Sequence, residues 1–179
     1  VAPSVMYVDS ESESPLFPYK GKDAAAKTIT AVLNAMTNND SKSVACVPGV
    51  EIRIVSGSRL TDSGMVLDVP IVIRGESDNP TNVVITASAK GTRAFTLNND
   101  GAQIENLTVS GSGALSQNGG HVSVSKGTVR NCIIENGSTS TGYDSVYGNN
   151  IFLSGGILEV TAGRTPFADN KIRLNFSTG

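Results

Sequence analysis

Apolar and polar residues alternate with a period of two along most of the chain from Val44 onward. Short runs rich in Val, Ile, Thr and Leu follow one another, separated by Gly, Asn, Asp or Ser. This pattern predicts short β-strands joined by tight turns. The runs are SVACV, EIRIV, GMVLDV, IVIRG, NVVITA, AFTL, QIENLTV, HVSV, TVRNCII, NIFL, ILEV and KIRLNF. They indicate an all-β fold, and taken alone they also fit a β-sandwich.

The segment before Val44 has a different pattern. A strand-like run, VMYV, is followed by an acidic, proline-containing loop, DSESESPLFPYKG. Five apolar residues then share one face at helical spacing: Ala25, Ile29, Val32, Leu33 and Met36. We predict one helix here, with Asp23 as its N-cap and the polar stretch TNNDSKS as its end.

A repeat of apolar positions decides between the all-β alternatives. The pair Phe95 and Leu97 recurs as Val122 and Val124, 27 residues later (95 to 122). The next copy of Val122 is Ile151, 29 residues later (122 to 151). Repeats of this length that hold two or three strands each indicate a solenoid, in which stacked coils share one core.

The stretches GAQIENLTVSG, from Gly101, and GTVRNCIIENG, from Gly127, carry the same repeat in their polar residues. Asn106 recurs as Asn131, 25 residues later (106 to 131). Parallel stacking places equivalent residues about 4.8 Å apart, so the two side chains should form an amide ladder. Val160 occupies the next equivalent position, where we expect the ladder to stop or the coil to be remodelled.

Three segments resemble a known family: PGVEIRIVSG, VLDVPIVIRGESDNPTNVVITA and AFTLNNDGAQIENLTVSG. They look like the opening coils of the pectin-lyase-like right-handed parallel β-helix superfamily. The later segments GGHVSVSKGTVRNCIIENG and GNNIFLSGGILEV resemble coils of bacterial secreted and cell-surface β-helix proteins. The resemblance covers roughly residues 44–160 and is more specific for fold than for activity.

The resemblance implies an all-β, right-handed parallel β-helix (β-solenoid) of about five coils with an N-terminal capping α-helix. Residues 1–43 would supply the N-terminal strand, the loop and the capping helix, which covers the otherwise exposed end strand. Residues 44–179 would form the coils, and the ending NFSTG suggests that they are truncated at the C-terminus. We expect a monomer, or edge-to-edge contacts at the uncapped C-terminal end.

Charge and composition exclude some classes of partner. The 179 residues carry a net charge of -2 without a basic cluster, so nothing attracts nucleic acid or anionic lipid. No apolar run reaches the roughly 20 residues of a membrane-spanning helix, so we expect no membrane insertion. The first residue is Val1, which fits a removed signal peptide. Together with the resemblance, this predicts a secreted or cell-surface bacterial protein.

The two cysteines, Cys46 and Cys132, each lie in an apolar run, VACV and NCII. In the expected fold they are separated by about three coils, or about 15 Å of rise. A disulfide needs a Cα separation below about 7 Å. We therefore predict two free, buried thiols.

The resemblance also implies where catalysis would be found. Lyases of this superfamily use aspartates that bind Ca²⁺ and an arginine or lysine base, and its hydrolases use clustered aspartates. The coil region has no DxD or DD pair. Glu105 and Arg130 occupy matched positions, where an exposed cross-strand ion pair is favoured over a catalytic pair. We expect His121 to be a solvated strand-end residue rather than a base, and Asp100 to form a turn rather than bind Ca²⁺.

An insert at residues 136–150, NGSTSTGYDSVYGNN, interrupts the repeat. It contains Tyr143, Asp144 and Tyr147, which are candidate carbohydrate-binding residues. Exposed aromatic rings on a loop can stack on sugars, and a nearby carboxylate can bind their hydroxyl groups. The alternative is that both tyrosines fold back over the side of the solenoid.

These observations favour a non-catalytic secreted or cell-surface module that contacts polysaccharide or cell-surface glycan, or acts as an adhesin-like scaffold. One alternative is the N-terminal part of a polysaccharide lyase or glycoside hydrolase. The other is a purely structural stalk. We expect no cofactor, with Ca²⁺ only in the lyase-like case.

Overall fold

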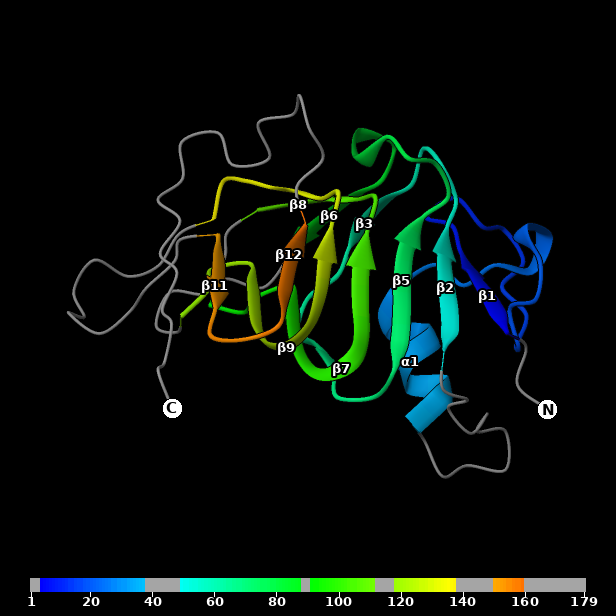
Figure 1. The fold of residues 1–179 in the computed structure, drawn as a ribbon. Coiled ribbons are helices and arrows are strands. Elements are labelled where there is room, and N and C mark those ends of the chain that lie inside the picture. Colours follow the sequence, from blue (N-terminus) through cyan, green and yellow to red (C-terminus); the bar gives the residue numbers. More distant parts are fainter. Residues whose placement is uncertain (1–3, 38–48, 88–90, 112–117, 138–149, 160–179) are drawn as a thin grey trace.

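The computed structural model describes residues 4–37, 49–87, 91–111, 118–137 and 150–159 (Figure 1). These residues form two β-sheets and one α-helix, and every strand pair is parallel. The all-β prediction is confirmed. In this part of the chain, no helix is both long enough and apolar enough to cross a membrane.

The larger sheet has eight strands. Its main path is β1 (Val5–Val8), β2 (Val50–Ile54), β5 (Ile71–Gly75), β7 (Phe95–Glu105), β9 (Val122–Arg130) and β11 (Ile151–Leu153), with β4 (Met65–Leu67) paired to β7 and β12 (Ile157–Glu159) paired to β9. The smaller sheet has four strands in the order β10 (Ile133–Ile134), β8 (Thr108–Gly111), β6 (Val84–Ala87) and β3 (Arg59–Thr61). Two 3₁₀ turns, η1 (Lys22–Ala24) and η2 (Pro80–Asn82), complete the described elements.

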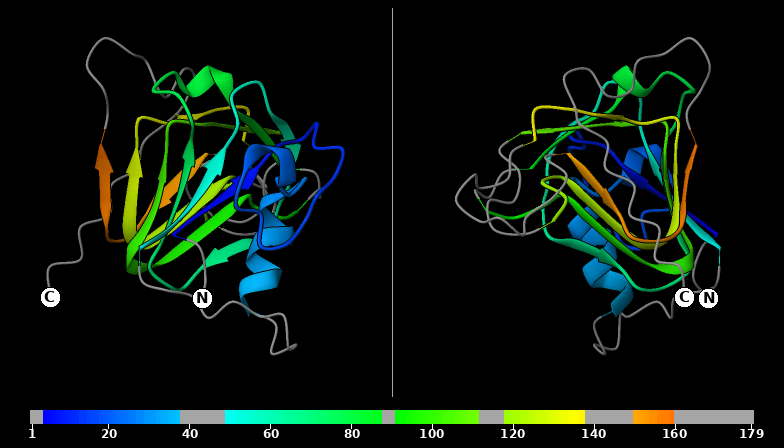
Figure 2. Two further views of the ribbon diagram at one scale, coloured as in Figure 1. Left: turned by 90° about the vertical axis from the view of Figure 1, so that its right-hand side faces the viewer. Right: turned by 60° about the vertical axis from the view of Figure 1, so that its left-hand side comes forward.

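The chain passes repeatedly from the larger sheet to the smaller one, from β2 to β3, β5 to β6, β7 to β8 and β9 to β10. The strands of successive passages lie next to one another in the views of Figure 2. The predicted offsets are confirmed, because Phe95 pairs with Val122 and Val122 pairs with Ile151. The strand β3 was not predicted, since it has only three residues, of which two are exposed and polar.

The core is built from columns of apolar side chains that the parallel register stacks on each other. One column of buried residues in the larger sheet consists of Met6, Ile52, Ile73, Ile104 and Val129. A column in the smaller sheet consists of Leu60, Ile85, Val109 and Ile134. Each such side chain contributes about 1.5–3 kcal/mol when it is removed from water, so the columns are a main source of stability.

The corners between the two sheets differ from the prediction. The runs QIENLTV and TVRNCII were each predicted as one strand, but each is divided by its asparagine. Asn106 and Asn131 have φ of 57° and 45°, in the left-handed region. Asparagine tolerates this conformation better than most residues, which explains why it recurs at the position where the chain turns from one sheet to the other.

The helix α1 (Ile29–Thr37) begins later than predicted. Asp23, the predicted N-cap, lies in η1 instead. The Thr28 hydroxyl accepts from the amide of Ala31, and the Asp62 carboxylate accepts from the amides of Ile29 and Thr30. The helix starts where these oxygens satisfy its first free amides. The predicted apolar face is confirmed for Ile29, Val32 and Met36, which join the core, whereas Ala25 is buried but precedes the helix.

The outer edge of β1 is hydrogen-bonded to the segment that leads into the helix. Tyr7 donates its amide to the Tyr19 carbonyl at 2.8 Å and accepts from the Ala26 amide at 2.9 Å. The Asp9 amide donates to the Ala26 carbonyl at 2.8 Å. These bonds protect an edge that could otherwise pair with another chain. The runs SVACV and KIRLNF, and Val160, lie outside the described residues.

Candidate functional site

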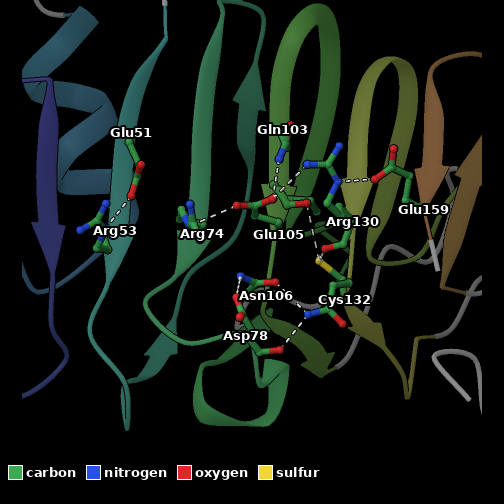
Figure 3. A network of polar contacts seen from close by, with 12 residues as sticks. Glu51, Arg53, Arg74, Asp78, Gln103, Glu105, Asn106, Arg130, Cys132 and Glu159 are labelled. Carbon is green, nitrogen blue, oxygen red and sulfur yellow. Dashed lines mark hydrogen bonds and ion pairs between the residues drawn. The ribbon is translucent and has the colours of Figure 1, made fainter. Parts of the chain in front are cut away.

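A row of polar side chains crosses the outward face of the larger sheet (Figure 3). Successive register pairs connect Tyr7, Arg53, Arg74, Glu105, Arg130 and Glu159, one from each of β1, β2, β5, β7, β9 and β12. We call this set the polar row. It exists because the strands are parallel and in step, so one outward position of each strand meets the same position of the next.

Arg53 holds the first part of the polar row. Its Nε donates to Glu51 Oε1 at 2.6 Å, and its guanidinium lies 5.9 Å from the centre of the Tyr7 ring. The hydrogen bond to Glu51 is the largest influence that raises the pKa of Arg53. The Arg53 guanidinium is therefore held over the Tyr7 ring, and its charge is neutralised by Glu51 of the same strand.

Glu105 is the centre of the polar row and receives three donors. Gln103 Nε2 donates to Glu105 Oε2 at 2.6 Å, Arg74 Nε lies 3.1 Å from Oε1, and Arg130 Nη1 lies 3.7 Å from Oε2. Both arginine contacts are ion pairs without hydrogen-bond geometry. The predicted cross-strand pair of Glu105 and Arg130 is confirmed. The pair was also predicted to be exposed. That prediction is wrong for Glu105, because only 9% of its side chain is accessible.

The far end of the polar row is open to solvent. Arg130 also donates through Nε to Glu159 Oε2, and both side chains are 46% exposed. This hydrogen bond is the first cause that lowers the pKa of Glu159 and raises the pKa of Arg130. An exposed pair of this kind adds little to stability.

No protein-family model matches this sequence, and neither a curated protein nor a solved structure matches it. Its function is therefore inferred from its own side chains. The two carboxylates of the polar row, Glu105 and Glu159, are paired with arginines, and so is the adjacent Glu51. Each of these carboxylates neutralises at least one neighbouring arginine.

The predicted amide ladder is confirmed between two corners. Asn131 Nδ2 donates to Asn106 Oδ1 at 2.8 Å and also to the Asp78 carbonyl at 2.8 Å. Asn106 Nδ2 donates to Asp78 Oδ1 at 3.3 Å. The ladder thus ties two successive corners to the loop that follows β5. Its role is structural, because each of these amide hydrogen bonds is made within the protein.

Cys132 is a free thiol, as predicted, and is buried. Its Sγ lies 3.2 Å from the Arg130 carbonyl and 3.7 Å from the Ile104 carbonyl. Burial raises the pKa of the Cys132 thiol to about 12. The thiolate form that reacts with electrophiles or metals is therefore scarce at neutral pH. Cys46 lies outside the described residues.

The prediction for His121 is wrong. Its side chain is not solvated, because the residue has no accessible surface. The run GGH directly before a strand had favoured an exposed turn. Here His121 lies at a corner, where its amide donates to the Asn150 carbonyl at 2.9 Å and its carbonyl accepts from the Phe95 amide at 3.0 Å.

Asp100 was predicted to form a turn, but it lies within β7, where the register with β9 shifts between Asn98 and Gln103. Asn99 Oδ1 accepts from the Gly101 amide at 2.9 Å, while the Asp100 side chain is 87% exposed and lies 3.9 Å from Lys126 Nζ. Within the described ranges, no three His, Cys, Asp or Glu side chains come together to form a metal site.

The candidate carbohydrate-binding residues Tyr143, Asp144 and Tyr147 lie outside the described residues. The structure does describe the two positions that flank residues 138–149. The Gly137 amide donates to Asn150 Oδ1 at 2.5 Å, and the Asn150 carbonyl accepts from the Val122 amide at 2.9 Å. Asn150 is buried and fixes both flanks to the start of β9. This role of Asn150 was not predicted, although an asparagine directly before a strand run could have suggested it.

Proposed function

We propose that this chain is a non-catalytic, secreted or cell-surface module of bacterial origin that contacts polysaccharide, or serves as an adhesin-like scaffold. In this proposal the fold is a right-handed parallel β-helix capped by α1. The parallel register from β1 to β11 and the repeated passage between two sheets support it. Connections between parallel strands are right-handed in nearly all proteins, which supports the handedness.

The proposed cap is supported by burial and by hydrogen bonds. Ile29 and Val32 of α1 have no accessible surface and pack in the same core cluster as the strands. The edge of β1 is hydrogen-bonded to Tyr19 and Ala26, upstream of the helix. A stack of coils needs such a cover at its end, because an open edge and an open core invite association with other chains.

The observation that carries the non-catalytic assignment is the internal pairing of the polar row. Glu105, its most buried carboxylate, is shared by Gln103, Arg74 and Arg130. A general acid or base must be free to bind and release a proton beside a substrate. The side chains of the polar row instead neutralise each other, as expected for a surface that holds the strands in register.

Glycan contact is assigned to the segment that interrupts the repeat. The hydrogen bond between Gly137 and Asn150 brings the flanks of residues 138–149 together, so the insert starts and ends at the same corner. Tyr143 and Tyr147 would stack on sugar rings, and Asp144 would accept hydrogen bonds from sugar hydroxyl groups. This placement separates binding from the residues that hold the coils together.

A glycan array tests the proposal. We expect the wild-type protein to bind a subset of the glycans. The Tyr143→Ala/Tyr147→Ala variant should lose at least about fivefold in signal, since ring stacking is worth about 0.5–1.5 kcal/mol per ring. The matched control is Tyr7→Ala, which removes a ring from the polar row and should leave binding unchanged. If the wild-type protein bound no glycan on the array, the proposal would be refuted in favour of a purely structural stalk. If only Tyr7→Ala lost binding, the glycan site would lie at the polar row instead.

A further inference from the structure

His121 is the one histidine of the chain, and its burial has no explanation in the polar row or the amide ladder. The residue has no accessible surface, and neither Nδ1 nor Nε2 makes a hydrogen bond of ordinary geometry to a described residue. A buried polar ring without partners costs free energy, and proteins retain few such groups.

The ring lies at the junction where three segments meet. The backbone of His121 is bonded to Asn150 on one side and to Phe95 on the other. Asn150 in turn accepts from the Gly137 amide, just after β10. We call His121, Gly137 and Asn150 the 121–150 corner. It adjoins β10 and β11, strands of only two and three residues, so few backbone bonds support it.

We propose that the 121–150 corner is an acid-sensitive latch: a proton taken up by His121 breaks the hydrogen bond between Gly137 and Asn150. An imidazolium cannot stay buried without acceptors for both of its N–H groups or a neighbouring anion. The corner relieves this by opening, which lets water reach the ring. This inference does not depend on glycan contact.

The electrostatic surroundings agree with the latch. Burial is the largest influence on the ring and lowers the pKa of His121 below the ordinary value of 6.5. The nearby carbonyls of Glu135 and Asn136 act in the opposite direction but are outweighed. The packed elements carry Arg93, Asp100 and Glu105 on or before β7, Lys126 and Arg130 on β9, and Glu135 after β10. None of their charges contributes to the shift of the His121 pKa.

The sign of the pH dependence follows from the lowered pKa. The closed corner holds His121 neutral, whereas an open corner lets it titrate near 6.5. The contribution to stability is therefore complete above about pH 6.5 and is lost as the pH falls toward the lower pKa of the closed state. Each pH unit between the two pKa values raises the open population about tenfold.

NMR spectroscopy on the whole chain tests the latch, because the single imidazole gives one titration curve. We expect a His121 pKa below 6.5. The hydrogen-exchange protection factor of the Gly137 amide, corrected for intrinsic rates, should begin to fall near pH 6.5 and level off near the His121 pKa. The Ile104 amide in β7 should keep its protection. A His121 pKa at or above 6.5, or a constant Gly137 protection factor through the titration, would overturn the proposal.

Two variants separate His121 from its neighbours. His121→Gln cannot take up a proton, so its Gly137 protection factor should no longer change with pH. Glu135→Gln removes the nearest carboxylate along the chain and should keep the wild-type pH dependence. The opposite result for either variant would contradict the latch. If His121→Gln does not fold, the wild-type protein decides the question: the latch requires that the Gly137 protection factor stops falling at the His121 pKa, and a fall that continues below this pKa would contradict it.

Discussion

Asn131 donates a side-chain hydrogen bond to Asn106 at 2.8 Å, across two successive corners of the fold. Both residues adopt positive φ, so each combines a backbone turn with an amide that binds the next corner. These two tasks explain why the asparagine recurs in GAQIENLTVSG and GTVRNCIIENG. The turn conformation and the amide hydrogen bond should each contribute separately to the free energy of unfolding.

Substitutions at Asn106 should separate the energetic cost of its positive φ from the contribution of its side-chain hydrogen bonds. Asn106→Gly keeps the positive φ without strain and loses only the hydrogen bonds to Asn131 and Asp78, so we expect a loss of about 1–2 kcal/mol in unfolding free energy. Asn106→Ala also places a Cβ in the left-handed region and should cost about 1–2 kcal/mol more. Urea denaturation measures both. Equal losses would show that the left-handed corner carries no cost.

Glu105 should be far more important for stability than Glu159, although both belong to the polar row. Glu105→Gln leaves Arg74 and Arg130 facing a neutral side chain in a nearly buried site, and we expect a loss of about 2 kcal/mol. Glu159→Gln removes an exposed partner and should change stability by less than about 0.5 kcal/mol.

Salt gives the control for this pair. The small effect of Glu159→Gln should vanish in 1 M NaCl, where the Debye length is only about 3 Å, whereas most of the Glu105→Gln effect should remain. If the two variants lost the same stability, or if salt removed both effects, the central position of Glu105 would be refuted.

The start of α1 should depend on a residue far away in sequence. Asp62→Ala removes the acceptor for the Ile29 and Thr30 amides, and we expect a loss of about 2 kcal/mol together with lower helix content in circular dichroism. Asp68→Ala is the matched control, because its side chain is exposed and only its carbonyl accepts, from Asn99. An Asp62→Ala variant as stable as Asp68→Ala would contradict the capping role.

The Cys132 thiol should be unreactive in the folded protein. In a Cys46→Ser background, labelling by Ellman's reagent at pH 8 should be at least about a thousandfold slower than in urea, since the pKa of about 12 leaves little thiolate. Absorbance of the released thiolate measures this rate. Labelling that is equally fast with and without urea would show that Cys132 is accessible.

The sequence allowed the all-β class, the single helix, the repeat offsets and the amide ladder to be predicted, because all of them depend on local periodicity. The strand breaks at Asn106 and Asn131 were missed, since the apolar run continues through the corner on both sides. The helix start was missed for a different reason. Its deciding acceptor, Asp62, is 33 residues from Ile29, and no local pattern reports such a contact.

In the candidate site, too, contacts set by strand register could be predicted, whereas contacts that depend on distant segments could not. Register alone predicted that Glu105 would lie beside Arg130. Its other two partners, Arg74 and Gln103, could not be predicted without the neighbouring strand and the exact side-chain directions. The burial of His121 could not be predicted, because its backbone is bonded to Phe95 and Asn150, which lie far from it in sequence.

Incubation with polygalacturonate, with and without Ca²⁺, tests the central claim most directly, namely that the polar row is structural rather than catalytic. The unsaturated product of a lyase is followed by its ultraviolet absorbance. We predict no product above the protein-free blank in either condition. Product that the wild-type protein forms, and that Glu105→Gln fails to form at a temperature where it remains folded, would contradict the account.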